Sequence, residues 1–375
     1  MDCRDSSVIP RSGTSLRPVR LLNDPDGVEV ATVHARVTRS SAPGSGAAAR
    51  TPPGGGAQGG AGGRSRRHLA RRRGELPGDR RGRGHHRTGT EPFRPGSEWA
   101  YMLSGSCRIS AVDHEGRNFI EDVKAGDLWF FPQGVPHNIQ ALDDGAQFLL
   151  VFDDGAFSEN NTFLLSDFFA HTPRHVLAKN FGWTREQMEN LPEREKYIFQ
   201  GDVPPPLQSD RVLSPTGDIP RSFKHRMTAQ TPQRFRGGSV RITDSTNFAA
   251  STTAAALVDV EPGGMRELHW HPTNDEWQYY ISGTGRMGVY AAQASARTFD
   301  FQAGDVGYVP FAYGHYIENT GDEPLVFLEM FKHPRFEDIS VMQWMANTPH
   351  EIIADTINVE KSIIDELPAT KQTVI

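Results

Sequence analysis

The segment Glu267-Leu268-His269-Trp270-His271-Pro272-Thr273-Asn274-Asp275-Glu276 carries the strongest signal of fold and chemistry in the chain. Side chains two residues apart in a β-strand face the same side, so a strand here would point His269 and His271 together into a barrel. Glu276 follows after a short turn, on the next predicted strand, and His315 comes thirty-nine residues after it. We therefore expect these four side chains to converge.

Three imidazoles and one carboxylate predict a His-His-Glu-His metal site. Four protein ligands leave two positions of an octahedral ion open for a small anionic substrate. This ligand set suits Mn²⁺, with Fe²⁺, Co²⁺, Ni²⁺ or Zn²⁺ as alternatives, because selectivity depends on geometry and metal supply. A single histidine on a half-exposed strand is usually an ordinary polar residue. The spaced combination of His269, His271, Glu276 and His315 instead favours a metal site.

Short predicted strands separated by turn signals surround this segment. Pairs such as Ser282-Gly283 and Gly304-Asp305 are typical of turns and separate the predicted strands. Many short strands at close spacing indicate an antiparallel sandwich or barrel. The predicted strands of this half are Ala255–Val260, Trp277–Ile281, Arg286–Tyr290, Arg297–Phe301, Val306–Pro310, Tyr316–Asn319 and Leu325–Met330.

The chain repeats itself at an offset of 178 residues. Glu98-Trp99-Ala100-Tyr101-Met102-Leu103-Ser104-Gly105 matches Glu276-Trp277-Gln278-Tyr279-Tyr280-Ile281-Ser282-Gly283. One offset held over forty residues indicates two copies of one domain. The same offset relates Gly126 to Gly304, Pro132 to Pro310 and His137 to His315.

A short helical tail is predicted after each copy. The pattern Thr172-Pro173 recurs as Thr348-Pro349, at a slightly different offset. Thr348, Pro349 and Glu351 predict an N-cap and first turn, followed by an apolar-periodic helix.

Composition places the chain among globular proteins and excludes several classes. Its 375 residues are enough for two domains, and 37 glycines with 26 prolines favour a turn-rich β protein. No run of eighteen apolar residues and no apolar leader segment is present, so we expect neither a membrane span nor secretion. Cys3 and Cys107 make no disulfide framework, and two free thiols favour the cytoplasm. The net charge of −6 argues against nucleic acid as a general partner.

Residues 41–95 have a different composition from the rest. The stretch 61–95 contains eleven arginines, no lysine and three acidic residues, after two glycine-rich runs. Such a segment buries too little apolar surface to order itself, so we predict disorder. It could be a polyanion-binding arm, an inert linker, or the product of reading a GC-rich gene in the wrong frame. The third explanation fits the abrupt return to a strand pattern at Glu98.

From about residue 96 to the C-terminus, the sequence resembles the cupin superfamily. The first motif is His269-x-His271-x4-Glu276-x6-Gly283, and the second runs from Gly304 through Pro310 to His315, with Ala312 where glycine is common. Longer stretches, among them Met265-Arg266-Glu267-Leu268-His269-Trp270-His271, resemble bicupin oxalate decarboxylases. The resemblance implies two tandem jelly-roll-like β-barrels, each followed by short helices. The domains would then be 1–40 (N-terminal segment), 41–95 (low complexity), 96–230 (cupin 1, incomplete) and 231–375 (cupin 2).

The first copy keeps only part of the metal motif. Glu98 and His137 stand thirty-nine residues apart, as in the second copy. The 178-residue offset places Glu91 and Phe93 where the His-x-His pair belongs. His85 and His86 are close by, but adjacent residues point to opposite faces of a strand. We therefore expect an incomplete first site.

The resemblance implies a mechanism and a set of residues. It implies manganese, a dioxygen requirement, and conversion of oxalate to formate and CO2, in trimers or hexamers. Glu159, in a stretch resembling the family's lid over the first site, carries over as general acid. Arg266 could hold a remote substrate carboxylate, the alternative being a surface arginine. Glu329 lies in an apolar run and needs a buried partner, for which Arg266 is the candidate.

Two other functions stay open. The chain could be a non-catalytic metal-binding bicupin with a degenerate first copy. It could also be an oxalate oxidase that works through the second site.

Overall fold

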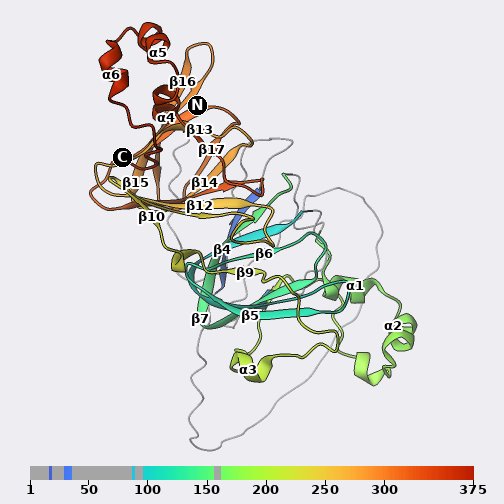
Figure 1. Ribbon diagram of the computed structural model, residues 1–375. Helices are drawn as coiled ribbons and strands as arrows, with labels where there is room; N and C mark the ends of the chain where they lie inside the picture. Colours follow the sequence, from blue (N-terminus) through green and yellow to red (C-terminus); the bar gives the residue numbers. More distant parts are fainter. Residues whose placement is uncertain (1–16, 19–28, 36–86, 89–95, 156–161) are drawn as a thin grey trace, which may run out of the picture. The chain divides into compact units, whose positions relative to one another are not determined.

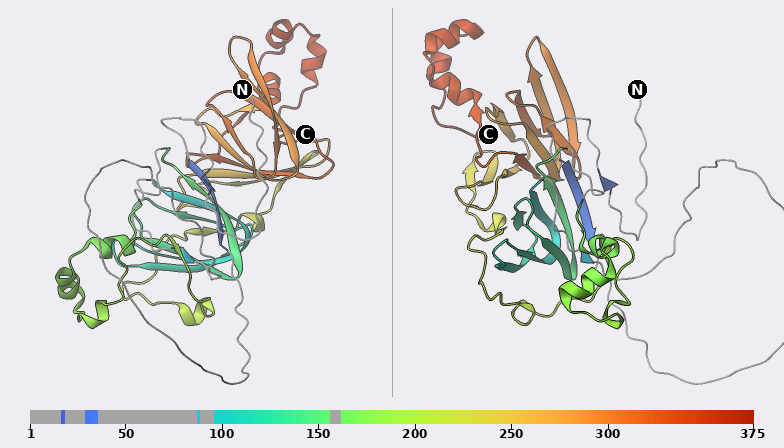
Figure 2. Two further views of the ribbon diagram at one scale, coloured as in Figure 1. Left: turned by 180° about the vertical axis from the view of Figure 1, so that it is seen from behind. Right: turned by 90° about the vertical axis from the view of Figure 1, so that its right-hand side faces the viewer.

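The computed structural model describes residues 17–18, 29–35, 87–88, 96–155 and 162–375, the first three ranges by their backbone alone. Figures 1 and 2 show a protein made mainly of β-strands, with short helices after each group of strands. The predicted fold class is confirmed in the described residues. The glycine- and arginine-rich stretch of residues 41–95 lies outside them, apart from Arg87–Thr88.

The first barrel is built around two long antiparallel strands, β4 (Glu98–Val112) and β7 (His137–Phe152), which pair along most of their length. The sheet order is β1-β2-β7-β4-β6-β9, and β5 pairs with β4. Its other strands are β1 (Arg17–Pro18), β2 (Glu29–Ala35), β3 (Arg87–Thr88), β5 (Asn118–Lys124), β6 (Leu128–Phe131), β8 (Ile198–Phe199) and β9 (Lys224–His225).

The second barrel consists of two antiparallel sheets, with orders β10-β11-β12-β19-β14-β17 and β16-β15-β18-β13-β20. The strands of the first sheet are β10 (Gln233–Phe235), β11 (Gly238–Thr243), β12 (Ala254–Val260), β14 (Glu276–Ser282), β17 (Val306–Val309) and β19 (Leu325–Phe331). Those of the second are β13 (Met265–Trp270), β15 (Thr284–Ala291), β16 (Ser295–Gln302), β18 (Gly314–Asn319) and β20 (Ile339–Ser340). All seven strands predicted by range are present, within two residues at each end.

Buried hydrophobic side chains fill each barrel, because alternate residues of each strand face inward. One cluster fills the first barrel around Trp129 and Phe148, and another fills the second around Tyr280 and Phe327. A further cluster draws on strands of both barrels, and it includes Trp99 from β4. Packing in these cores therefore holds in place the strands that carry the predicted ligands.

The backbone conformation at one position of the repeat requires glycine in both copies. Gly105 and Gly283, 178 residues apart, both have a positive φ, of 73° and 78°. A Cβ atom at Gly105 would lie 2.1 Å from the Gly145 carbonyl oxygen, and one at Gly283 would lie 2.6 Å from that of Pro324. Only glycine fits where the backbone is left-handed and approaches another strand this closely.

Short helices follow each barrel: α1 (Leu165–His171), α2 (Arg174–Phe181) and α3 (Leu207–Asp210), then α4 (Val341–Ala346), α5 (His350–Ile357) and α6 (Lys361–Asp365). Figure 2 shows α5 and α6 standing outside the sheets. The predicted start of α5 was wrong by one residue, because Pro349 is its N-cap and the Thr348 hydroxyl donates to the Trp344 carbonyl instead. None of the helices in the described part of the chain is long and apolar enough to traverse a lipid bilayer.

Candidate metal centre

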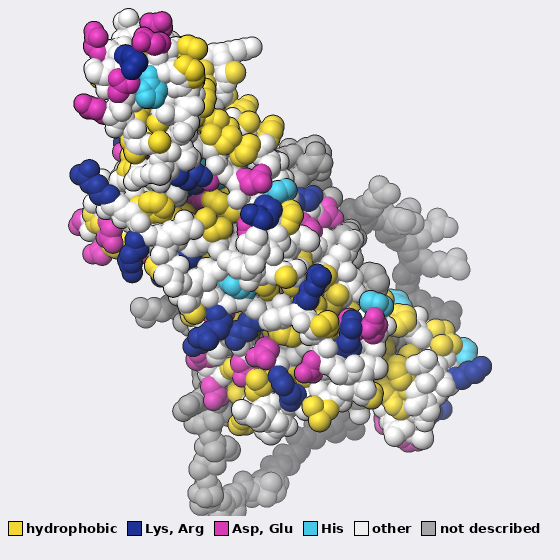
Figure 3. All heavy atoms as spheres, viewed as in Figure 1, with side chains coloured by type: hydrophobic (Ala, Val, Ile, Leu, Met, Phe, Trp, Pro, Cys, Tyr) yellow, Lys and Arg dark blue, Asp and Glu magenta, His cyan; other side chains and the backbone are white. Residues whose placement is uncertain are grey.

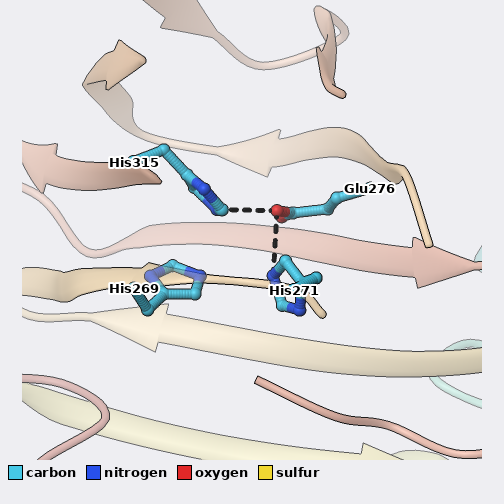
Figure 4. Close-up of side chains that lie close together, drawn as sticks. All are labelled: His269, His271, Glu276 and His315. Carbon is cyan, nitrogen blue, oxygen red and sulfur yellow. Dashed lines mark ion pairs between the residues drawn. The ribbon is translucent and has the colours of Figure 1, made fainter. Parts of the chain in front are cut away.

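Two paired strands of one sheet, β13 and β18, and strand β14 of the other sheet position the four predicted ligands. His269 lies in β13 and is paired in register with His315 of β18. His271 follows one residue after the end of β13, and Glu276 is the first residue of β14. Figure 4 shows the four side chains facing one another. The exposed Leu268 between buried neighbours confirms the strand alternation that directs His269 and His271 inward.

The ligand atoms of His269, His271, Glu276 and His315 all lie within 4.8 Å of one another. The Glu276 Oε2 atom is 2.7 Å from His315 Nε2 and 3.1 Å from His271 Nε2. All four side chains are buried, with exposed fractions of at most 3%. Such a group of polar atoms in a barrel interior needs a shared partner.

Backbone carbonyls fix the orientation of each imidazole. The Nδ1–H group of His269 donates to Glu267 O (2.7 Å), that of His271 to Glu337 O (2.9 Å) and that of His315 to Tyr313 O (3.0 Å). With the proton on Nδ1, the Nε2 atom presents a lone pair to the centre of the cluster. This arrangement is the usual outer support of metal-binding histidines.

The four candidate ligand atoms are among the buried side-chain atoms that lack a hydrogen bond. The Nε2 atoms of the three histidines and Oε2 of Glu276 have no hydrogen-bond partner in the described part of the chain. Lone pairs facing a carboxylate oxygen at these distances repel it unless a cation lies between them. The donor set therefore fits a divalent cation held by three nitrogens and one oxygen.

Electrostatic effects keep His269 neutral and Glu276 charged. Burial holds the pKa of His269 well below its ordinary range, and the charge of Arg266 lowers it further. Burial opposes the charge of Glu276, but His315 and His271, in their protonated forms, would outweigh it and lower the Glu276 pKa. Burial would likewise lower the pKa of His271, but Glu276 outweighs it and raises that pKa. Neutral imidazoles and an ionised carboxylate are the forms that bind metal.

A buried ion-pair network adjoins the ligands. Arg266 donates from Nε to Glu329 Oε1 (3.0 Å), from Nη2 to Asp338 Oδ2 (2.7 Å) and from Nη1 to Thr373 O (3.4 Å). Arg266 is fully buried, so the surface-arginine alternative was wrong, and the expected pair with Glu329 forms. Burial opposes the charge of Asp338, but Arg266 and Lys371 outweigh it and lower the Asp338 pKa to about 2.

The first barrel contains half of the corresponding set within the described residues. Glu98 Oε2 lies 3.5 Å from His137 Nε2, and both side chains are buried. His137 Nδ1 donates to Val135 O (2.8 Å), as His315 does to the carbonyl two residues before it. The indole of Trp129 donates to Glu98 Oε1 (3.2 Å). The orientation of the two ligands is thus preserved.

Several predicted residues lie outside the described residues. Glu159 is one, because residues 156–161 are not described. The others are Glu91 and Phe93, at the expected His-x-His positions, and His85 and His86.

Sequence analysis missed three polar residues beside the site. The Gln278 amide donates to Glu276 Oε1 (2.8 Å), and the Tyr280 hydroxyl donates to Gln278 Oε1 (2.8 Å). Asp338 is the third, the second carboxylate on Arg266. The i, i+2, i+4 spacing of Glu276, Gln278 and Tyr280 could have revealed the first two. Asp338 is 72 residues from Arg266 and gave no local signal.

Comparison with known proteins agrees with this architecture. The cupin family model matches residues 94–189 and 227–365. The chain is 56% identical over 280 residues to the oxalate decarboxylase OxdC of Bacillus subtilis, covering 74% of this chain and 73% of that protein. A structure of that enzyme at pH 4.6 superposes with a TM-score of 0.75 and 54% identity, over 78% of this chain and 76% of the other.

A further structure of the Bacillus subtilis enzyme, from work on the EPR parameters of its Mn(II) centres, has a TM-score of 0.74 and 54% identity. It covers 77% of this chain and 78% of the other. With two cupin barrels, a clustered ligand set and this degree of identity, the chain belongs to the bicupin oxalate decarboxylase family of enzymes.

Proposed function

We propose that this protein decarboxylates oxalate to formate and CO2 with manganese bound in the second barrel. The observation that carries this proposal is the set of four buried ligand atoms, within 4.8 Å of one another and without hydrogen-bond partners. The Mn(II) centres of the similar Bacillus subtilis enzyme favour manganese among the possible ions. The resemblance adds dioxygen as a required co-reactant.

His269, His271, Glu276 and His315 would hold the ion and leave positions for a small anion. A bound divalent cation would neutralise charge on one carboxylate of oxalate and orient it. The surrounding strands bury all four ligands, so water is largely excluded from the place where the substrate would bind.

Arg266 and Glu329 would act together beside the ion. Arg266 has five N–H groups, of which three bond to Glu329, Asp338 and Thr373. Among the described residues the other two have no partner, and they would be available to the second carboxylate of oxalate. Glu329 is paired in register with Gln278 and therefore faces the same side of the sheet as Glu276. Its Oε2 atom is buried and has no hydrogen-bond partner among the described residues.

Burial raises the pKa of Glu329, although the charge of Arg266 opposes this shift. A carboxyl group with a raised pKa in a dry site can carry a proton to a carbanionic product such as nascent formate. Glu159, in the stretch resembling a lid, keeps its proposed role as general acid for the first barrel.

A metal-binding protein without turnover is the second candidate, because the described residues of the first barrel supply only Glu98 and His137. Activity would then be impaired to the extent that decarboxylation requires a first site. Oxalate oxidase activity from the second barrel is the remaining alternative.

We also propose a homo-oligomer, a trimer or hexamer as in the family. Large hydrophobic side chains are exposed on the helices that follow each barrel. Figure 3 shows hydrophobic side chains on the surface in the region of α1 and α2. The exposed residues are Phe168, Val176 and Phe181 on the first set of helices, and Trp344, Ile352, Ile357 and Ile363 on the second. Several large hydrophobic side chains exposed on the same helices favour association with another protein surface. Light scattering of the purified chain should give a mass of three or six subunits.

One assay separates the three functions. Purified protein is analysed for bound metal, and formate, CO2 and peroxide are then measured from oxalate at mildly acid pH. Formate with CO2 and manganese supports the decarboxylase. Peroxide without formate indicates the oxidase, and bound manganese without either product indicates the binding protein.

A further inference from the structure

The two barrels hold the carboxylate ligand with different donors. In the first barrel the Trp129 indole of β6 donates to Glu98 Oε1 (3.2 Å). In the second the Gln278 amide of β14 donates to Glu276 Oε1 (2.8 Å). In both cases Oε1 is occupied, and Oε2 is the oxygen that faces a histidine.

The donor positions are related by the repeat. The 178-residue offset relates Ala100 to Gln278 and Trp129 to Gly307. These residues are also directly paired across neighbouring strands, Ala100 with Trp129 and Gln278 with Gly307. Each barrel thus has one large donor and one small residue at this pair of positions. The donor stands on the second strand of the pair in the first barrel (Trp129) and on the first strand in the second barrel (Gln278).

Steric fit favours the exchange. A Cβ atom at Gly307 would lie 2.6 Å from Gln278 Oε1, well inside van der Waals contact. Opposite Trp129 stands Ala100, and both are fully buried. A long side chain on one strand is therefore accommodated best opposite a very small one, because close packing leaves little space beside it.

In the second barrel, a hydrogen bond from Tyr280 fixes the orientation of the Gln278 amide. The Tyr280 hydroxyl donates to Gln278 Oε1 (2.8 Å), which leaves the Gln278 Nε2–H group for the carboxylate. A carboxylate accepts hydrogen bonds only, so the reversed amide would place two acceptors in contact. Burial raises the pKa of Tyr280 well above its ordinary value and keeps the hydroxyl protonated.

We propose that Gln278 is a positioning residue that holds Glu276 Oε1 so that only Oε2 is available to the metal, and that Gln278–Gly307 and Ala100–Trp129 are interchangeable solutions to this task. The inference rests on the metal site of the proposed function. It adds that metal affinity depends on a side chain that does not bind the ion.

The test measures Mn²⁺ affinity of the full-length chain by competition with a chelator, together with the EPR spectrum of bound Mn²⁺ and the melting temperature of the metal-free protein. Gln278→Leu removes the donor but keeps much of the volume. It should weaken Mn²⁺ binding about 10- to 100-fold, the usual effect of losing an outer hydrogen bond to a ligand, and change the EPR fine structure. Tyr280→Phe keeps the donor and should weaken binding by a smaller factor.

A second variant tests the exchange itself. Gln278→Ala/Gly307→Trp builds the first barrel's pair into the second and should recover affinity relative to Gln278→Ala alone. The proposal is overturned if Gln278→Leu binds Mn²⁺ within twofold of the parent with an unchanged EPR spectrum. It is also overturned if the folded exchange variant binds no better than Gln278→Ala. If the parent chain itself binds no Mn²⁺, the proposed function fails instead.

Discussion

The two barrels have corresponding strands around their candidate metal sites. They differ in how many candidate ligands the described residues supply. Both place a glutamate at the start of a strand and a histidine thirty-nine residues later, with its Nδ1 bonded to a carbonyl two residues before it. Only the second adds His269 and His271 within 4.8 Å. In the described residues, the same supports therefore surround two candidate ligands in the first barrel and four in the second.

The largest expected effect concerns the buried arginines of the two barrels. Arg266→Met leaves Glu329 and Asp338 as buried carboxylates without their cation, and should lower the free energy of unfolding by about 3–5 kcal/mol. Arg108→Met in the first barrel is the matched control. Its partners Asp122 and Asp210 are about one third exposed, so the loss should be near 1 kcal/mol. Urea unfolding measures the free energy of unfolding of both variants. Equal decreases for the two would show that the Arg266 network stabilises the fold no more than the Arg108 network does.

The histidines at matching positions test the metal sites. His315→Ala removes a ligand and should weaken Mn²⁺ binding more than about 100-fold, beyond the usual effect of an outer-shell change. His137→Ala should leave the manganese of the second barrel in place. Equilibrium dialysis gives both values. If His137→Ala instead lost a full equivalent of manganese, the first barrel would be a working site and the comparison would be wrong.

Acid should selectively weaken the second barrel's ion-pair network. The Asp338 pKa is about 2 in the folded chain against 3.8 ordinarily, so its charge stabilises the fold above about pH 4. This contribution, about 2 kcal/mol, is lost as the pH falls from about 4 to 2. Asp338→Asn should therefore be less stable than the parent at neutral pH, and the gap should close in that acid window. A gap that stays constant from pH 7 to 2 would show that the Asp338 charge contributes nothing.

The smallest expected effect comes from one backbone position. Ala312 has φ 60°, and its repeat counterpart Gly134 has φ 75°. A left-handed conformation disfavours alanine by about 1 kcal/mol relative to glycine, so Ala312→Gly should raise the free energy of unfolding by about that amount and Gly134→Ala should lower it. Thermal melts of both variants check the opposite signs, and shifts in the same direction would exclude the strain argument.

The clustering of the four candidate ligands was predictable because a strand period of two and a repeat of 178 residues are properties of the sequence itself. The same patterns predicted the two barrels and seven of their strands. The partner Asp338 and the Gln278–Gly307 pair were not predicted, because each depends on which strands become neighbours after folding. The start of α5 was misjudged because Thr348 bonds backward to Trp344, and the helix begins after Pro349.

Anomalous diffraction at the manganese edge, from crystals of the full-length chain grown with Mn²⁺, tests the metal site most directly. We expect a strong peak within bonding distance of Nε2 of His269, His271 and His315 and of Glu276 Oε2. Crystals that bind manganese elsewhere, with no peak between these four atoms, would contradict this expectation.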